Sequence, residues 1–177
     1  MFQTSMGAFI ASIPAFTPET RLATDRGEIA LEDLDIGQKL LTRDHGLRVL
    51  KAVSRVRFGW RALALNPLLR PISIAPGALG GGHPEREILA APSRRFLLRL
   101  SGHGKTSECW MRALDMLGQE GVALSPVSEV TYLHLDLGGP AQVLADGCWC
   151  ESGMIDAQDD TGAAAAEPAV LEFLAAG

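Results

Sequence analysis

Two cysteines separated by one residue, Cys148 and Cys150, are the pair whose type and spacing first suggest chemistry. Thiols at this spacing could bind a metal ion or form a redox pair, but two cysteines are only half of a zinc site. Cys109 or a histidine would have to complete the site, and none lies at a zinc-finger spacing. We expect no metal site and a strand whose thiols pack inward while Trp149 covers the rim. A thiol or metal-binding protein built on this pair is the weaker alternative.

A small basic cluster is the second candidate, because Arg94 and Arg95 are followed by Arg99 in an otherwise acidic chain. Two interpretations are open. The cluster could be a solvated strand face that pairs with Glu85 and Glu87. It could instead form a pocket for an anion or carboxylate, since a guanidinium group matches carboxylate geometry.

The segments that carry these residues have the pattern of short strands separated by turns. Residues 49–58 (VLKAVSRVRF) alternate as a half-exposed strand does, and residues 130–137 form a second strand. Asp25-Arg26-Gly27 predicts a tight hairpin because Gly27 tolerates a positive φ.

Helices are expected to be few and short. Residues 110–117 (WMRALDML) predict the best one, ended by Gly118. Residues 59–69 are less certain, because proline at positions 67 and 71 disfavours a helix just before it. Residues 101–104 are expected to form a loop, and residues 168–176 a brief helix that begins at Pro168.

Composition limits the class of protein. The 177 residues fit one domain, and 47% hydrophobic content with a mean hydropathy of +0.13 predicts a folded, soluble chain. A net charge of −5 argues against a nucleic-acid partner, which needs phosphate neutralisation. No apolar run reaches the length of a membrane span.

The compartment is expected to be the cytoplasm. No Lys or Arg precedes Arg21, so the basic start of a Sec signal peptide is missing. Three cysteines do not suggest a disulfide framework and are typical of thiols in a reducing compartment. Secretion by a route other than Sec stays open.

Three stretches carry a resemblance to a known family. They are residues 16–44 (FTPETRLATDRGEIALEDLDIGQKLLTRD), 70–98 (RPISIAPGALGGGHPEREILAAPSRRFLL) and 130–147 (VTYLHLDLGGPAQVLADG). In this order they resemble Hint domains, the self-processing module shared by inteins and hedgehog C-terminal regions, and are most similar to the bacterial stand-alone branch. The resemblance implies an all-β, horseshoe-like fold of short strands with one or two short helices over residues 13–153. Residues 1–12 would be a lead-in, and residues 154–177 an acidic, alanine-rich linker with a short C-terminal helix.

The resemblance also implies acyl transfer within one chain. A thiol or hydroxyl at the first residue of the domain attacks the carbonyl just before it, and the leaving nitrogen is protonated. The nucleophile position, immediately before the Phe-Thr-Pro segment, is Ala15 in this chain. The histidine expected near the scissile nitrogen is replaced by Arg94, which stays protonated and cannot shuttle a proton near neutrality.

One histidine matches the family pattern: His134, in the Tyr-x-His strand. A further histidine is expected in the next hairpin, where this chain has Pro140 at about that place. The terminal His-Asn pair that inteins use is not found after Glu151-Ser152. The plain alternative for His134 is a structural histidine whose hydrogen bonds are satisfied.

Together these positions predict a catalytically inactive Hint domain that works as a binding or structural module for an unidentified protein or peptide, without a cofactor. Its degenerate cleft would combine Ala15, Arg94 and His134. The alternative is residual autoprocessing near residue 15 with another nucleophile, Thr17 or Ser12.

Overall fold

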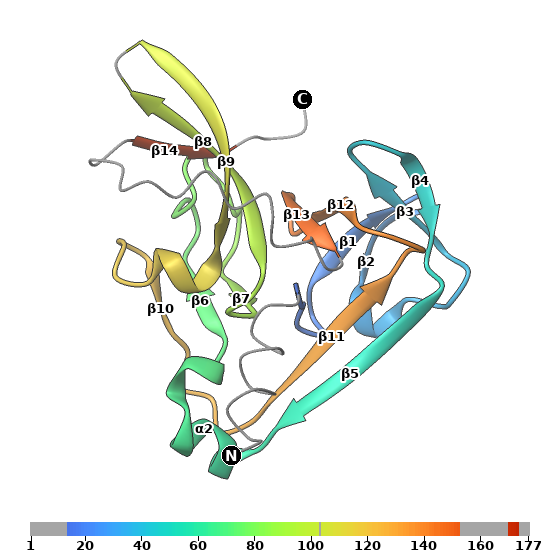
Figure 1. Ribbon diagram of the computed structural model, residues 1–177, viewed down its shortest axis with the longest axis horizontal. Coiled ribbons are helices and arrows are strands. Elements are labelled where there is room, and N and C mark those ends of the chain that lie inside the picture. Colours follow the sequence, from blue (N-terminus) through green and yellow to red (C-terminus); the bar gives the residue numbers. More distant parts are fainter. Residues whose placement is uncertain (1–13, 103, 153–169, 174–177) are drawn as a thin grey trace.

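The computed structural model describes residues 14–102, 104–152 and 170–173, and strands predominate in this part of the chain (Figure 1). The strands of the largest sheet are β1 (Arg21–Thr24), β2 (Gly27–Ala30), β3 (Lys39–Thr42), β4 (Gly46–Val49), β8 (Arg95–Gly102), β9 (Lys105–Arg112), β12 (Ala141–Ala145), β13 (Cys148–Ser152) and β14 (Val170–Phe173). Their order is β14-β8-β13-β12-β1-β3-β4, with β2 paired to β1 and β9 to β8. The expected all-β class is confirmed.

Two smaller sheets complete the described part. One contains β6 (Ile72–Ile74), β7 (Ile88–Ala90) and β10 (Val122–Leu124), in the order β10-β6-β7. The other is a two-stranded ribbon of β5 (Ala52–Phe58) and β11 (Val130–Asp136), which pairs from Val130↔Phe58 to Asp136↔Ala52. The strands predicted within residues 49–58 and 130–137 form this ribbon. It runs along one side of the molecule (Figure 1).

The helices of the described residues are short. They are α2 (Trp60–Leu65) and three 3₁₀ turns, η1 (Leu31–Asp33), η2 (Pro67–Leu69) and η3 (Ala113–Met116). Helix α2 ends at Leu65, and the next residue, Asn66, caps the start of η2, because its side-chain oxygen accepts a hydrogen bond from the Leu68 amide at 3.2 Å. No helix in the described residues is long and apolar enough to cross a membrane.

Three local predictions were wrong. Residues 110–112 end strand β9, and only Ala113–Met116 form a helical turn, because β9 pairs with β8 along its whole length. Residues 101 and 102 belong to the same hairpin rather than to a loop. Residues 170–173, expected in a helix, form strand β14 against residues 98–101; the rest of the predicted C-terminal helix lies outside the described residues.

The core joins all three sheets in one cluster of buried side chains. Phe16, Leu40, Ile74, Phe96 and Leu133 belong to it, and each is at most 1% exposed. A polar side chain that reaches this cluster must therefore find its partners inside the protein.

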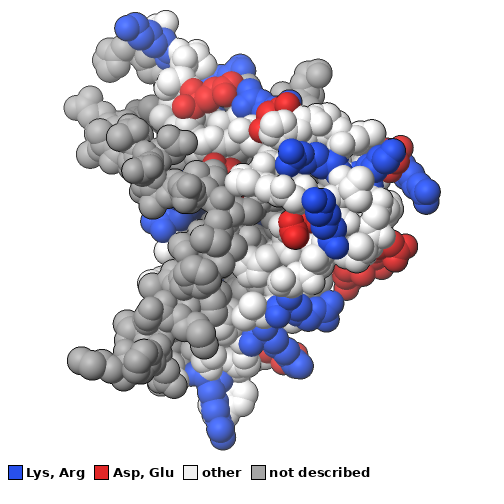
Figure 2. Space-filling view, turned by 45° about the vertical axis from the view of Figure 1, so that its right-hand side comes forward, with Lys and Arg blue, Asp and Glu red and all other residues white. Residues whose placement is uncertain are grey.

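Basic side chains follow one another along the face of the molecule on which β3, β4 and β5 lie (Figure 2). The Lys and Arg residues of these strands and their connections are Lys39, Arg43, Arg48, Lys51, Arg55 and Arg57. The charge of this acidic chain is therefore unevenly distributed.

Candidate functional site

Ala15 is placed by a short β-bridge between its neighbour Phe16 and Leu133 of β11. The Phe16 amide donates to the Leu133 carbonyl at 2.9 Å, and the Leu133 amide donates back to the Phe16 carbonyl at 2.8 Å. Because the bridge is antiparallel, Ala15 lies opposite His134. The alanine is 2% exposed, so this part of the chain is enclosed.

A small cavity of about 20 Å³ lies beside Ala15. Its walls are formed by Phe58, Leu68, Leu69, Pro92, Ser93, Tyr132 and His134. This volume is enough for one water-sized group. The structure thus brings together the start of the domain, the turn after strand β7 and His134.

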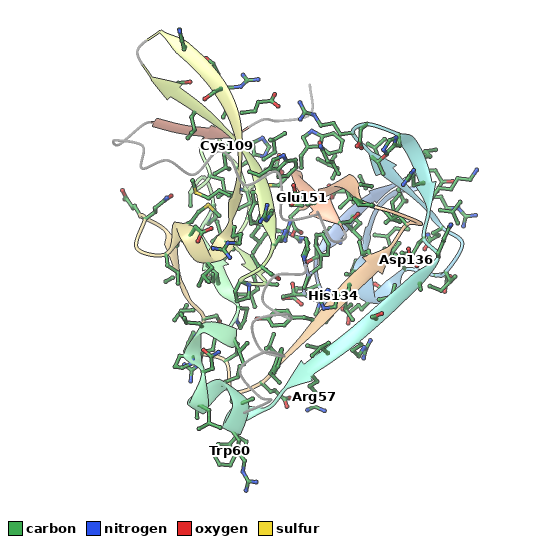
Figure 3. All side chains as sticks on the ribbon, in the orientation of Figure 1. Arg57, Trp60, Cys109, His134, Asp136 and Glu151 are labelled. Atoms are coloured by element: carbon green, nitrogen blue, oxygen red, sulfur yellow. The ribbon has the colours of Figure 1, made fainter. Side chains whose placement is uncertain are left out.

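His134 approaches the backbone at the position where the family's reaction would begin. Its Nδ1 lies 3.1 Å from the carbonyl oxygen of Pro14, the carbonyl that a nucleophile at residue 15 would attack. Since a carbonyl oxygen can only accept, this contact requires the proton on Nδ1. A donor in this position polarises the carbonyl. Figure 3 shows His134 on β11, near the middle of the molecule.

Arg94 does not line this cavity. Its side chain is completely buried. The guanidinium donates to Asp146 Oδ2 at 3.0 Å, to the Ala145 carbonyl at 2.9 Å and to Cys150 Sγ at 3.3 Å, and it lies 4.7 Å and 5.4 Å from the ring centres of Phe96 and Phe16. Burial lowers the pKa of Arg94, but Cys150 and Asp146 raise it by more, so its pKa is raised overall and the charge is kept.

Both interpretations of the basic cluster are therefore wrong for Arg94. The residue is completely buried, and each of its three side-chain nitrogens already donates to an acceptor inside the protein, so it does not hold an external anion. Arg95 is half-buried and lies 3.7 Å from Glu151 Oε2, a partner different from the expected Glu85 and Glu87.

Cys148 and Cys150 face the core, as predicted. Both are 0% exposed and neither forms a disulfide. Burial raises the pKa of each thiol, so both stay protonated near neutral pH and are poor nucleophiles. Within the ranges that the structure describes, no group of three or more His, Cys, Asp and Glu side chains is placed to hold a metal ion.

The alternative nucleophile Thr17 lies outside the Ala15 cavity. Its hydroxyl donates to the Leu89 carbonyl at 3.0 Å, and Thr20 Oγ1 lies at 3.1 Å. Ser12, the other alternative, lies outside the described residues. Pro140 is exposed in the turn after β11 and does not line the Ala15 cavity.

One polar residue of the cavity, Tyr132, was missed at the level of sequence. The Tyr132 hydroxyl donates to the Leu69 carbonyl at 2.8 Å, and burial raises its pKa, so it stays protonated. Its spacing from His134 was a usable signal, because residues i and i+2 of a strand share a face. Ser93 lies in the turn beside Arg94, which was expected at the cleft, and is 5% exposed.

The family model of the Hint domain matches residues 14–157. The chain belongs to the Hint domain family. No curated protein matches it significantly.

Solved structures similar to this Hint domain include inteins. The gp41-1 intein is 11% identical, covers 76% of this chain and 95% of its own, and has a TM-score of 0.45. The MchDnaB-1 intein is 12% identical over 78% of this chain and 100% of its own, with a TM-score of 0.46. A bacterial intein-like domain from Clostridium thermocellum is 13% identical over 80% of this chain and 100% of its own, with a TM-score of 0.47.

Proposed function

We propose that this Hint domain no longer processes itself and works as a binding or structural module for a protein or peptide partner. The observation that carries the proposal is the environment of Arg94. The residue that stands at the position of the family's histidine is fully buried, bound to Asp146 and permanently protonated, so it cannot deliver a proton to the scissile nitrogen.

The remaining groups support the same conclusion. Acyl transfer needs a nucleophile, a group that polarises the carbonyl and a proton donor for the leaving nitrogen. Ala15 offers only a methyl group in place of the nucleophile, whereas His134 still contacts the Pro14 carbonyl. Of the three requirements, the second alone is met by these three residues.

Intact mass tests the loss of self-cleavage. The purified chain is incubated with an excess of dithiothreitol at neutral pH, and its mass is followed over a day. We expect a single species with the mass of the whole chain. A fragment of residues 1–14, together with a remainder that begins at Ala15, would contradict the proposal.

A cysteine restored at position 15 is expected to be insufficient for self-cleavage. The cavity beside Ala15 has room for one sulfur atom, so Ala15→Cys should fold as the parent does. It should remain uncleaved under the same thiol treatment, because the scissile nitrogen still has no proton donor. Ala23→Cys on β1 is the matched control for side reactions of an added thiol. Release of residues 1–14 by Ala15→Cys and not by the control would show that Arg94 is no obstacle to cleavage.

A further inference from the structure

A second and larger cavity lies between the turn at residues 17–20 and strand β7. Its volume is about 450 Å³, and the residues around it include Glu19, Thr20, Glu87, Leu89 and Ser125. A neighbouring cavity of about 360 Å³ shares two residues with it. These volumes fall in the range of ligand-binding pockets. The acyl-transfer chemistry discussed above uses none of the five residues.

Two hydroxyl groups of this cavity have unused hydrogen-bonding capacity. Ser125 is 7% exposed, and within the described part of the chain its hydroxyl has no hydrogen-bond partner. Thr17 gives its one hydroxyl proton to the Leu89 carbonyl, so in its 3.1 Å contact with Thr20 it must accept. Thr20 therefore has only acceptor lone pairs left for a ligand. The Ser125 hydroxyl opens onto the cavity and is not among the buried atoms without a partner, so it can still donate to or accept from a ligand.

The charge of the cavity favours a cation. Glu19 and Glu87 both line it, and neither forms an ion pair with another described residue; Glu87 accepts only the hydroxyl of Ser73. The one basic side chain of the lining, Arg86, is 57% exposed and lies 3.5 Å from Asp146. Arg86 therefore pairs with Asp146 rather than with either glutamate, and because its side chain is exposed to water it offsets their charge only weakly.

The edge of strand β7 adds a backbone donor. β7 is the outer strand of its sheet. The Leu89 carbonyl points away from β6, since it accepts the hydroxyl proton of Thr17. The N–H and C=O of one strand residue point to the same side, so the Leu89 N–H also points toward the cavity. A free N–H at a strand edge can bind the carbonyl of an extended peptide.

We propose that this cavity binds a lysine or arginine side chain of a partner peptide. The cationic group lies between Glu19 and Glu87, near the Thr20 oxygen, and a carbonyl of the peptide accepts from the Leu89 N–H. The inference deepens the binding role proposed above and rests on it. The site is separate from the Ala15 cavity, so it does not depend on whether the domain can cleave itself.

Titration with short blocked peptides tests the site. The probes are acetyl-Ala-Arg-Ala-amide, acetyl-Ala-Lys-Ala-amide and acetyl-Ala-norleucine-Ala-amide, followed by ¹H–¹⁵N NMR of the full chain. We expect the first two to shift the amide signals of Thr20, Leu89 and Ser125 at millimolar concentration. The norleucine peptide should bind at least about tenfold more weakly, and the affinity of the basic peptides should fall as salt is raised.

A conservative variant of Glu87 tests whether its negative charge contributes to binding of the basic peptides. Glu87→Gln keeps an oxygen for the Ser73 hydroxyl but removes the charge, so it should weaken the arginine peptide by about fivefold to tenfold. Glu108→Gln on β9 makes the same chemical change at an exposed site outside the cavity and should leave the affinity unchanged.

Each contrary result overturns a stated part of the proposal. If no peptide shifts these amides, or if norleucine binds as tightly as arginine, recognition of a basic side chain is wrong. If agmatine, which has no peptide backbone, binds as tightly as the arginine peptide, the role of the β7 edge is wrong. None of these results changes the intact-mass experiment, so a failure here and a failure of the proposed loss of cleavage can be told apart.

Discussion

Arg94 is held by three acceptors and two aromatic rings, so replacing it removes more than a charge. Arg94→His would leave Asp146, whose side chain is 4% exposed, without its nearest cation. Breaking a buried ion pair on one side costs about 3–5 kcal/mol, because the remaining charge stays buried. We expect the free energy of unfolding, measured by urea denaturation, to fall by about that amount.

A second substitution separates charge from packing. Adding Asp146→Asn removes the buried carboxylate that has lost Arg94, and Asn tolerates the positive φ of 51° found at this position, so part of the stability should return. Arg99→His, at a half-buried position of β8, is the control and should change stability by less than about 1 kcal/mol. An Arg94→His protein as stable as its parent would show that the buried pair contributes little.

For individual residues, the sequence predicted where the site residues lie better than it predicted the directions of their side chains. The Phe-Thr-Pro segment and the Tyr-x-His strand were enough to predict that Ala15 and His134 share a cleft, and the bridge at Phe16 places them opposite each other. The direction of Arg94 could not be predicted in this way. It depends on Asp146, 52 residues away, whose place is fixed only when β12 and β13 pair beside the turn.

Strand β13 carries a pH-dependent element, because Glu151 is buried among residues that give it no hydrogen-bond donor at Oε2. Burial raises its pKa from 4.5 to about 7, and Arg95 only partly offsets this. The folded state therefore holds the proton more tightly than the unfolded state. Stability from this group is full below about pH 4.5 and is lost as the pH rises to about 7, by up to roughly 3 kcal/mol.

Glu151→Gln should remove this dependence. The variant should be more stable than the parent at pH 8, and the difference should shrink toward pH 5, in urea unfolding followed by circular dichroism. Glu129→Gln, an exposed residue that pairs with Arg57, should show neither effect. Equal stability of the Glu151→Gln variant and the parent at pH 8 would mean that the carboxyl is solvated in the folded state.

Strands and turns that depend on the local sequence pattern could be predicted, whereas segments whose structure depends on pairing with a distant strand could not. The turn at Asp25-Arg26-Gly27 is local and forms as expected, and the alternation of residues 49–58 is local and forms strand β5 from Ala52 onward, while Val49 ends β4. Residues 110–117 have a helical composition, but the long hairpin partner β8 draws the first part of them into β9. Residues 170–173 likewise become a strand because the edge of β8 is there to pair with them.

For the molecule as a whole, the net charge of −5 and the local basic face have opposite consequences for a polyanion. On that face, Arg43 pairs with Glu108 and Arg57 pairs with Glu129. Four of the six basic residues of the face, Lys39, Arg48, Lys51 and Arg55, remain without an ion pair among the described residues. The face can therefore attract an anion at short range, while the rest of the molecule repels it.

The balance between the negative net charge and the basic face predicts that duplex DNA binds to this protein only at low salt. Four unpaired cations can neutralise only about four phosphates, and even a protein that makes about 6–10 such contacts loses most of its affinity as salt rises toward about 0.2 M. Screening therefore leaves little binding at about 0.15 M salt. We expect the fluorescence anisotropy of a labelled duplex of about 20 base pairs to stay unchanged at that salt concentration and to rise slightly at about 0.02 M. Lys51→Ala with Arg55→Ala should abolish the low-salt signal, whereas Lys105→Ala on β9 should not. Binding that persists at physiological salt would instead make the β3–β5 face a nucleic-acid interface, because its local charge would then outweigh the net charge of the chain.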